Sequence, residues 1–123
     1  MNKINQHTIL FMSWCTLTQK IRFATEPNNP NIIYQFLNFK FKAGMINKEA
    51  YREQLISQFR LLIDTIADEL LPSHWRRLCL DNIYRPLHTL HRIADCPNSK
   101  QQVLTLTNEL RIISHYLQAG LSV

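Results

Sequence analysis

Residues 99–120 read SKQQVLTLTNELRIISHYLQAG, and this stretch decides the fold class. Its apolar side chains recur three or four residues apart, at Val103, Leu106, Leu110, Ile113 and Leu117. This spacing places them on one face of an α-helix, because a helix completes a turn every 3.6 residues. Ser99 followed by Gln102 has the pattern of a capping box, and Gly120 is a typical terminator. The stretch predicts an amphipathic helix with Ser99 as its N-cap.

The same periodicity, interrupted by proline and glycine, predicts four more helices upstream. The first covers 7–24; the second has Asn29 as its cap and Pro30 as its first residue, and stops at Gly44. The third begins after Asn47, ends before Pro72 and buries Leu55, Phe59, Leu62, Ile66 and Leu70. The fourth has Ser73 as its cap and buries Leu80, Ile83, Leu87, Leu90 and Ala94.

Proline and β-forming residues complicate two of these helices. Pro86 lies inside the fourth helix and is expected to kink or split it near residues 82–85. Residues 32–41 are rich in β-formers, but the helix-capping residues around them favour a helix. The sequence therefore predicts an all-α protein, a single compact bundle of about five helices over residues 1–123.

Composition excludes several classes of protein. The 123 residues suffice for one domain, and only two of them are glycine, which excludes glycine-rich phosphate loops and Rossmann fingerprints. The three cysteines form no CxxC pair or even-numbered disulfide framework, which is typical of reduced thiols in a cytoplasmic protein. The apolar run at 8–17 is followed by Lys20 and Arg22, so it favours a buried helix over a signal peptide and is too short to span a membrane.

Residues 85–96, RPLHTLHRIADC, hold the densest cluster of chemically capable side chains. His88 and His91 share a helix face, and Asp95 and Cys96 follow. The nearest upstream cysteine, Cys79, would lie about 13 Å from His88 along a continuous helix. The zinc-binding patterns H-E-x-x-H and C-x-x-C are both absent. We therefore expect a solvated face with a His91–Asp95 pair and no metal, although Cys15 or His115 of another helix could complete a metal site with this cluster. We also expect no cofactor, catalytic site or small-molecule substrate.

The basic residues of the fourth helix favour contacts with nucleic acid. The formal net charge is +5, and arginine suits phosphate oxygens. The candidate nucleic-acid-binding residues are Arg76, Arg77, Arg85, His88 and Arg92, with Lys40 and Lys42 at the end of the second helix. Tyr84 offers a ring for stacking on an unpaired base. The competing interpretation is a solvated face on which Arg77, Asp81 and Arg85 partly neutralise one another.

Aromatic side chains surround the predicted second helix, namely Tyr34, Phe36, Phe39 and Phe41. A helix that is apolar on nearly all sides must be covered on all sides. It is either a central core helix or a helix covered by another protein. The second possibility leaves open a small protein-binding regulator or adaptor of the immunity, anti-activator or chaperone type.

LNFKFKAG at residues 37–44, the length, the basic charge and the predicted five helices suggest a family. In these features the chain resembles the small helical subunits of CRISPR effector complexes. The segment at 37–44 is similar in character to a helix end of some members. These antiviral-defence subunits are non-enzymatic and hold guide and target nucleic acid through its backbone. The resemblance implies a cytoplasmic subunit of a larger ribonucleoprotein or DNA-binding assembly, with protein and nucleic-acid partners. It assigns no role to an individual residue.

Overall fold

The structure, a computed structural model, describes the backbone of residues 6–39 and 47–121 and the side chains of residues 12–39 and 47–117. Its helices are α1 (Gln6–Arg22), α2 (Asn31–Leu37), α3 (Lys48–Ala67), α4 (Ser73–Asn82), α5 (Tyr84–Ile93) and α6 (Pro97–Leu121). No strand occurs within these ranges. The predicted all-α bundle is confirmed, and the predicted fourth helix is two helices, α4 and α5.

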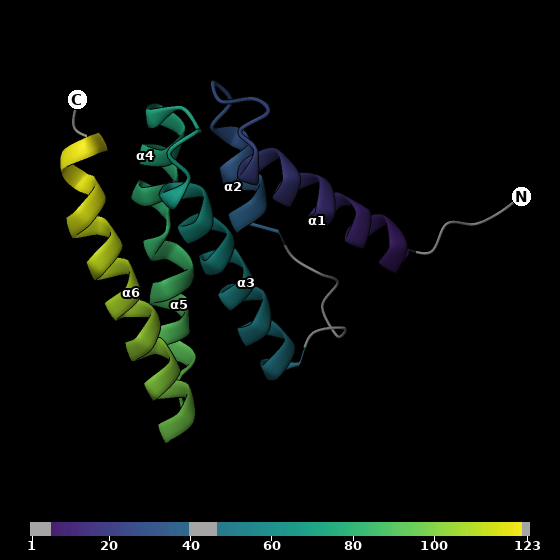
Figure 1. The fold of residues 1–123 in the computed structure, drawn as a ribbon. Coiled ribbons are helices and arrows are strands. Elements are labelled where there is room, and N and C mark those ends of the chain that lie inside the picture. The colour runs from purple at the N-terminus through teal and green to yellow at the C-terminus, as the bar shows by residue number, and fades with distance from the viewer. Residues whose placement is uncertain (1–5, 40–46, 122–123) are drawn as a thin grey trace, which may run out of the picture.

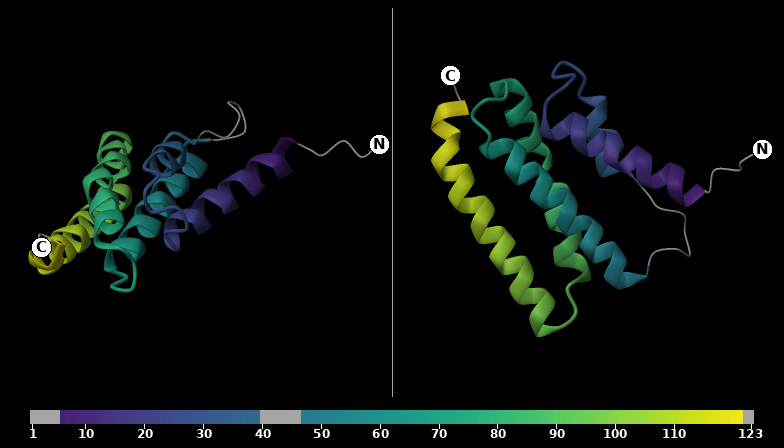
Figure 2. Two further views of the ribbon diagram at one scale, coloured as in Figure 1. Left: turned by 90° about the horizontal axis from the view of Figure 1, so that it is seen from above. Right: turned by 45° about the vertical axis from the view of Figure 1, so that its right-hand side comes forward.

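Helix α3 lies at the centre of the bundle and packs against α1, α4, α5 and α6. Helices α1 and α2 lie on one side of it, while α4, α5 and α6 lie on the other (Figures 1 and 2). The α3 side chains Phe59, Leu62 and Ile66 are completely buried, as the periodicity predicts. Leu70, predicted to join them, is 94% exposed because α3 ends at Ala67 and leaves Leu70 in a turn.

The break between α4 and α5 falls within the predicted range, at Ile83. This buried residue ends α4 and precedes α5, while Pro86 is the third residue of α5. Proline is tolerated there because the first N–H groups of a helix have no partner within the helix. The helix therefore restarts just before Pro86, and the proline lies in a first turn where it costs little.

Tertiary contacts end α2 earlier than the sequence predicts. Asn38 and Phe39 are not helical, and the rest of the predicted extension, residues 40–46, lies outside the described residues. Gln58, which is buried on α3, donates from Nε2 to the Phe36 carbonyl at 3.0 Å, and Gln54 donates to the Phe39 carbonyl at 2.9 Å. These side chains supply donors to the Phe36 carbonyl in the last turn of α2, which also accepts from the Phe39 N–H, and to the Phe39 carbonyl beyond the helix.

The predicted helix caps have mixed outcomes. Asn47 accepts a hydrogen bond from the Ala50 N–H at 2.8 Å, so the predicted cap of α3 is confirmed. Ser73 is the first residue of α4 and not its cap; the N-cap is Pro72, which makes no side-chain capping hydrogen bond. Ser99 is also wrong as an N-cap, because α6 begins two residues earlier, at Pro97.

Helix α1 ends on a left-handed residue. Ala24 has a φ of 48°, a conformation that glycine usually supplies. The Thr25 N–H reaches back to the Lys20 carbonyl at 3.1 Å, which is the wider hydrogen bond of a Schellman motif. The helix therefore stops at Arg22 and not at the predicted residue 24.

Rings from α1, from α2 and from the residues that follow α2 pack together on one side of α3. The Trp14 ring centroid lies 4.9 Å from that of Phe36 and 5.3 Å from that of Phe39. Phe36 is completely buried, whereas Tyr34 is 40% exposed. The Phe36 and Phe39 rings therefore have a packing role within the fold, as the core interpretation of the second helix expects.

Candidate nucleic-acid interface

The solvent side of α5 carries basic and aromatic residues and no carboxylate. Tyr84, Arg85, His88, His91 and Arg92 are exposed, whereas the opposite side buries Pro86, Leu87 and Leu90. We call these five exposed residues the α5 face. The helix sequence, YRPLHTLHRI, contains neither aspartate nor glutamate, so no acid on α5 offsets the charge of its two arginines.

Hydrogen-bonding contacts connect the α5 face to helices on either side. The Arg85 guanidinium donates from Nη2 to Asn38 Oδ1 at 2.6 Å, next to the end of α2. His91 Nε2 lies 3.4 Å from the Thr107 hydroxyl of α6, within hydrogen-bond reach. The α5 face is therefore bounded by the end of α2 at one edge and by α6 at the other.

A groove lies beside the α5 face, against α6. It has a volume of about 340 Å³ and is lined by Tyr84, Leu87, Thr107, Leu110, Arg111, Ser114 and His115. Leu87 and Leu110 are buried, while Arg111 and His115 are exposed. Among the described residues that line it there is no carboxylate. The groove thus combines apolar side chains with hydroxyls, an aromatic ring and a guanidinium.

Arg111 and His115 are absent from the residues that sequence reasoning selected. They are four residues apart on the solvent side of the last helix, opposite its apolar stripe. A single arginine on the solvent side of a helix is common, so the sequence alone gives no reason to select Arg111. Only the packing of α5 against α6, which periodicity does not specify, makes Arg111 and Tyr84 line the same groove.

Arg76 is a correction to the predicted contact set. Only 7% of the residue is exposed, and its Nε donates a 2.8 Å hydrogen bond to the carbonyl of Ile66, at the end of α3. That carbonyl belongs to the last turn of a helix, where carbonyls lack donors within the helix. Arg76 therefore joins α4 to α3 and is removed from the candidate interface.

The remaining predicted contacts lie in different places. Arg77 is exposed on α4, before the break at Ile83, so a single helical face does not extend from it to α5. Arg85, His88 and Arg92 lie together on the α5 face. Lys40 and Lys42 lie outside the described residues.

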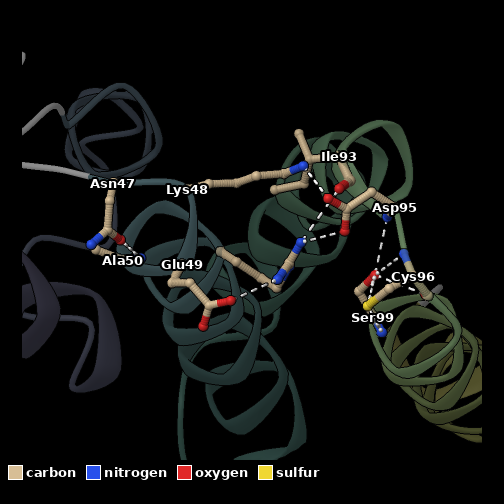
Figure 3. Close-up of polar contacts among 9 residues, drawn as sticks. Asn47, Lys48, Glu49, Ala50, Ile93, Asp95, Cys96 and Ser99 are labelled. Carbon is tan, nitrogen blue, oxygen red and sulfur yellow. Dashed lines mark hydrogen bonds and ion pairs between the residues drawn. The ribbon is translucent and has the colours of Figure 1, made fainter.

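The expected His91–Asp95 pair is replaced by contacts with α3. Asp95 forms ion pairs with Lys48 and, at 3.3 Å, with Arg52, which also donates to the Ile93 carbonyl at 3.4 Å (Figure 3). The Lys48 ammonium is the main reason why the pKa of Asp95 lies below its usual value. These contacts hold the end of α5 against the start of α3. Within the described residues, no group of three or more histidine, cysteine or acidic side chains is placed to hold a metal ion.

Cys96 and Ser99 shape the start of α6 (Figure 3). The Ser99 hydroxyl accepts from the N–H groups of Asp95 and Cys96, each at 3.1 Å, and the Ser99 N–H donates to Cys96 Sγ at 3.4 Å. The Ser99 hydroxyl, 3.3 Å from Sγ, is the main cause that lowers the pKa of the Cys96 thiol. By contrast, burial raises the pKa of Cys79 to about 12.

A larger hollow of about 620 Å³ lies beside Cys96, between α3 and α6. Arg52 lines it together with the carboxylate residues Glu49 and Glu53. Two acids beside one arginine give this hollow no cationic character, so it suits a polyanion less well than the groove beside the α5 face.

No helix in the described part of the chain is both long enough and apolar enough to cross a lipid bilayer. Comparison of the chain with protein-family models, curated proteins and solved structures finds no match. The candidate interface therefore rests on the positions of its own side chains.

Proposed function

We propose that this protein is a non-enzymatic nucleic-acid-binding subunit that holds a strand through its phosphates on the α5 face and the adjoining groove. The observation that carries this proposal is the presence of Arg85, Arg92 and Arg111 on two neighbouring helices, with no carboxylate on α5 or among the described groove residues. The resemblance to the small subunits of CRISPR effector complexes agrees with such a role within a larger assembly.

The arginines suit this role chemically. A guanidinium donates two parallel hydrogen bonds to a phosphate and stays charged at all physiological pH values. Neutralising phosphates releases condensed counterions, so binding weakens as salt rises. Three phosphate contacts to a single strand predict a slope of about −2 for log K against log salt, or about a 15-fold loss of affinity between 50 and 200 mM salt.

Charge reversal tests the proposal. We expect Arg111→Glu to weaken the binding of a fluorescent mixed-sequence 20-nucleotide strand about 10-fold at 50 mM salt, and to reduce the salt slope by about one. The matched control is Lys20→Glu on α1, which changes the net charge equally and breaks only the exposed pair with Glu26. Absence of strand binding at low salt, or equal loss in both variants, would contradict the proposal.

A second candidate function is protein binding by α6. Ile112 and Tyr116, one turn apart, are 69% and 79% exposed, and Leu104 on the same helix is 50% exposed. Exposed apolar side chains that adjoin one another mark protein-binding surfaces, such as those of adaptors and regulators. An adaptor role predicts that Ile112→Asp abolishes co-purification of a defined protein partner without changing affinity for nucleic acid.

A further inference from the structure

We infer that the groove between α5 and α6 binds an unpaired base, so that the preferred ligand is single-stranded nucleic acid. The base would stack on Tyr84, and Arg111 would hold a phosphate beside it. This inference rests on the proposed function, because it names the form of nucleic acid that the same surface binds.

The lining of the groove matches both the apolar flat face and the polar edge of a nucleobase. Leu87 and Leu110, which are only 6% and 2% exposed, form the apolar floor of the groove, and the half-exposed ring of Tyr84 supplies the apolar surface for the flat face of a base. Thr107 and Ser114 carry hydroxyls that donate to or accept from the polar edge of any base. Because hydroxyls both donate and accept, this lining favours no particular base.

Tyr84 is placed to supply the stacking surface. It is the first residue of α5, it lines the groove, and it is 52% exposed, so its side chain meets both the groove and solvent. Bases stack on such rings with little sequence preference, because every base has a π-face. Tyr84 does not belong to the core, which includes its neighbours Ile83 and Leu87.

The size of the groove fits one base and not a duplex. Its volume of about 340 Å³ has room for the ring system of one base, which is much smaller than the stacked and paired bases of a duplex. In a duplex the bases are stacked and paired, so a base enters a pocket only after it has been extruded. A single strand offers its bases without that cost, while both forms offer phosphates to Arg85 and Arg92.

The test compares three labelled 12-mers at 50 mM salt by fluorescence anisotropy: a mixed-sequence single strand, the matching duplex, and a fully abasic strand that keeps every phosphate. We expect the natural single strand to bind at least about 5-fold more tightly than either of the others. Tyr84→Leu should remove this advantage and Tyr84→Phe should keep it. Tyr51→Leu, which changes a 38%-exposed tyrosine on α3, is the matched control and should also keep it.

Each outcome separates the inference from the proposed function. Equal, salt-dependent binding of the natural and abasic strands would overturn the inference and leave backbone binding in place. Equal binding of the single strand and the duplex would likewise overturn the inference and leave backbone binding in place. Failure of all three ligands to bind at low salt would contradict the proposed function itself. The abasic comparison uses the unaltered protein, so it does not depend on whether the Tyr84 variants fold.

Discussion

Replacing Arg76 with methionine should destabilise the fold without weakening nucleic-acid binding. Methionine keeps an unbranched apolar chain of similar reach, so the substitution mainly removes the guanidinium and its 2.8 Å hydrogen bond to the Ile66 carbonyl. Arg77→Met is the matched control, since it makes the same chemical change at the next residue, where the side chain is exposed.

The expected loss follows from the burial of this contact. Arg76 is 7% exposed, and a hydrogen bond from a charged donor contributes roughly 1.5–3 kcal/mol, so we expect Arg76→Met to lower the free energy of unfolding by about 2 kcal/mol. This corresponds to a fall of about 1 M in the urea midpoint. For Arg77→Met we expect a change below about 1 kcal/mol, as for most exposed side chains.

Urea unfolding followed by far-ultraviolet circular dichroism measures the difference, and anisotropy with the labelled 20-nucleotide strand measures binding. Equal shifts in the urea midpoint for the two variants would refute the structural role of Arg76. A large loss of affinity in Arg76→Met, with its stability intact, would return this residue to the nucleic-acid contacts.

Three further predictions concern other parts of the fold. Cys96 is exposed and its pKa is lowered, so it should react with iodoacetamide at neutral pH well before the buried Cys79. Timed alkylation followed by mass spectrometry measures the order of labelling, and preferential labelling of Cys79 would contradict the structure. The hydrogen bond from Arg22 is the main cause that lowers the pKa of Asp68. The stabilisation of the fold by this carboxylate is therefore complete above the unfolded pKa of about 4 and is lost as pH falls through the folded pKa. Arg22→Met should destabilise the protein less at pH 2.5 than at pH 7 in urea unfolding, and equal destabilisation at both pH values would refute the linkage. Trp75→Phe, which removes a buried indole N–H that donates at 2.9 Å to a carbonyl of α1, should cost about 2–3 kcal/mol in urea unfolding, and a loss below about 0.5 kcal/mol would argue against that bond.

Local signals predicted most of the helices. The Asn47 side chain caps α3 because its bonds are made within one turn, and the break near Pro86 follows from a steric rule that acts over four residues. Phe59 and Leu62 are buried because apolar residues three or four apart lie on one side of a helix, and that side faces the core. This prediction needs no knowledge of which helices pack against it.

The errors arise where a distant residue decides the outcome. The early end of α2 depends on Gln54 and Gln58, which lie 15 and 22 residues from their acceptors. Arg76 looks like a surface arginine until its acceptor, ten residues earlier on α3, is known. The groove brings Tyr84 and Arg111 into one lining, which depends on the packing of α5 against α6. Helix periodicity contains none of this information.

The left-handed Ala24 has a consequence for the unfolded chain. A glycine at this position would relieve about 1 kcal/mol of backbone strain in the native state, because φ is 48°. It would also give the denatured chain more conformations to lose on folding, at a cost of about 0.4–1 kcal/mol, and would remove a buried methyl group. The relief of strain and these two losses nearly cancel, so a helix here ends without glycine at almost no net loss of stability. A chain with only two glycines among 123 residues thereby keeps its denatured ensemble comparatively stiff.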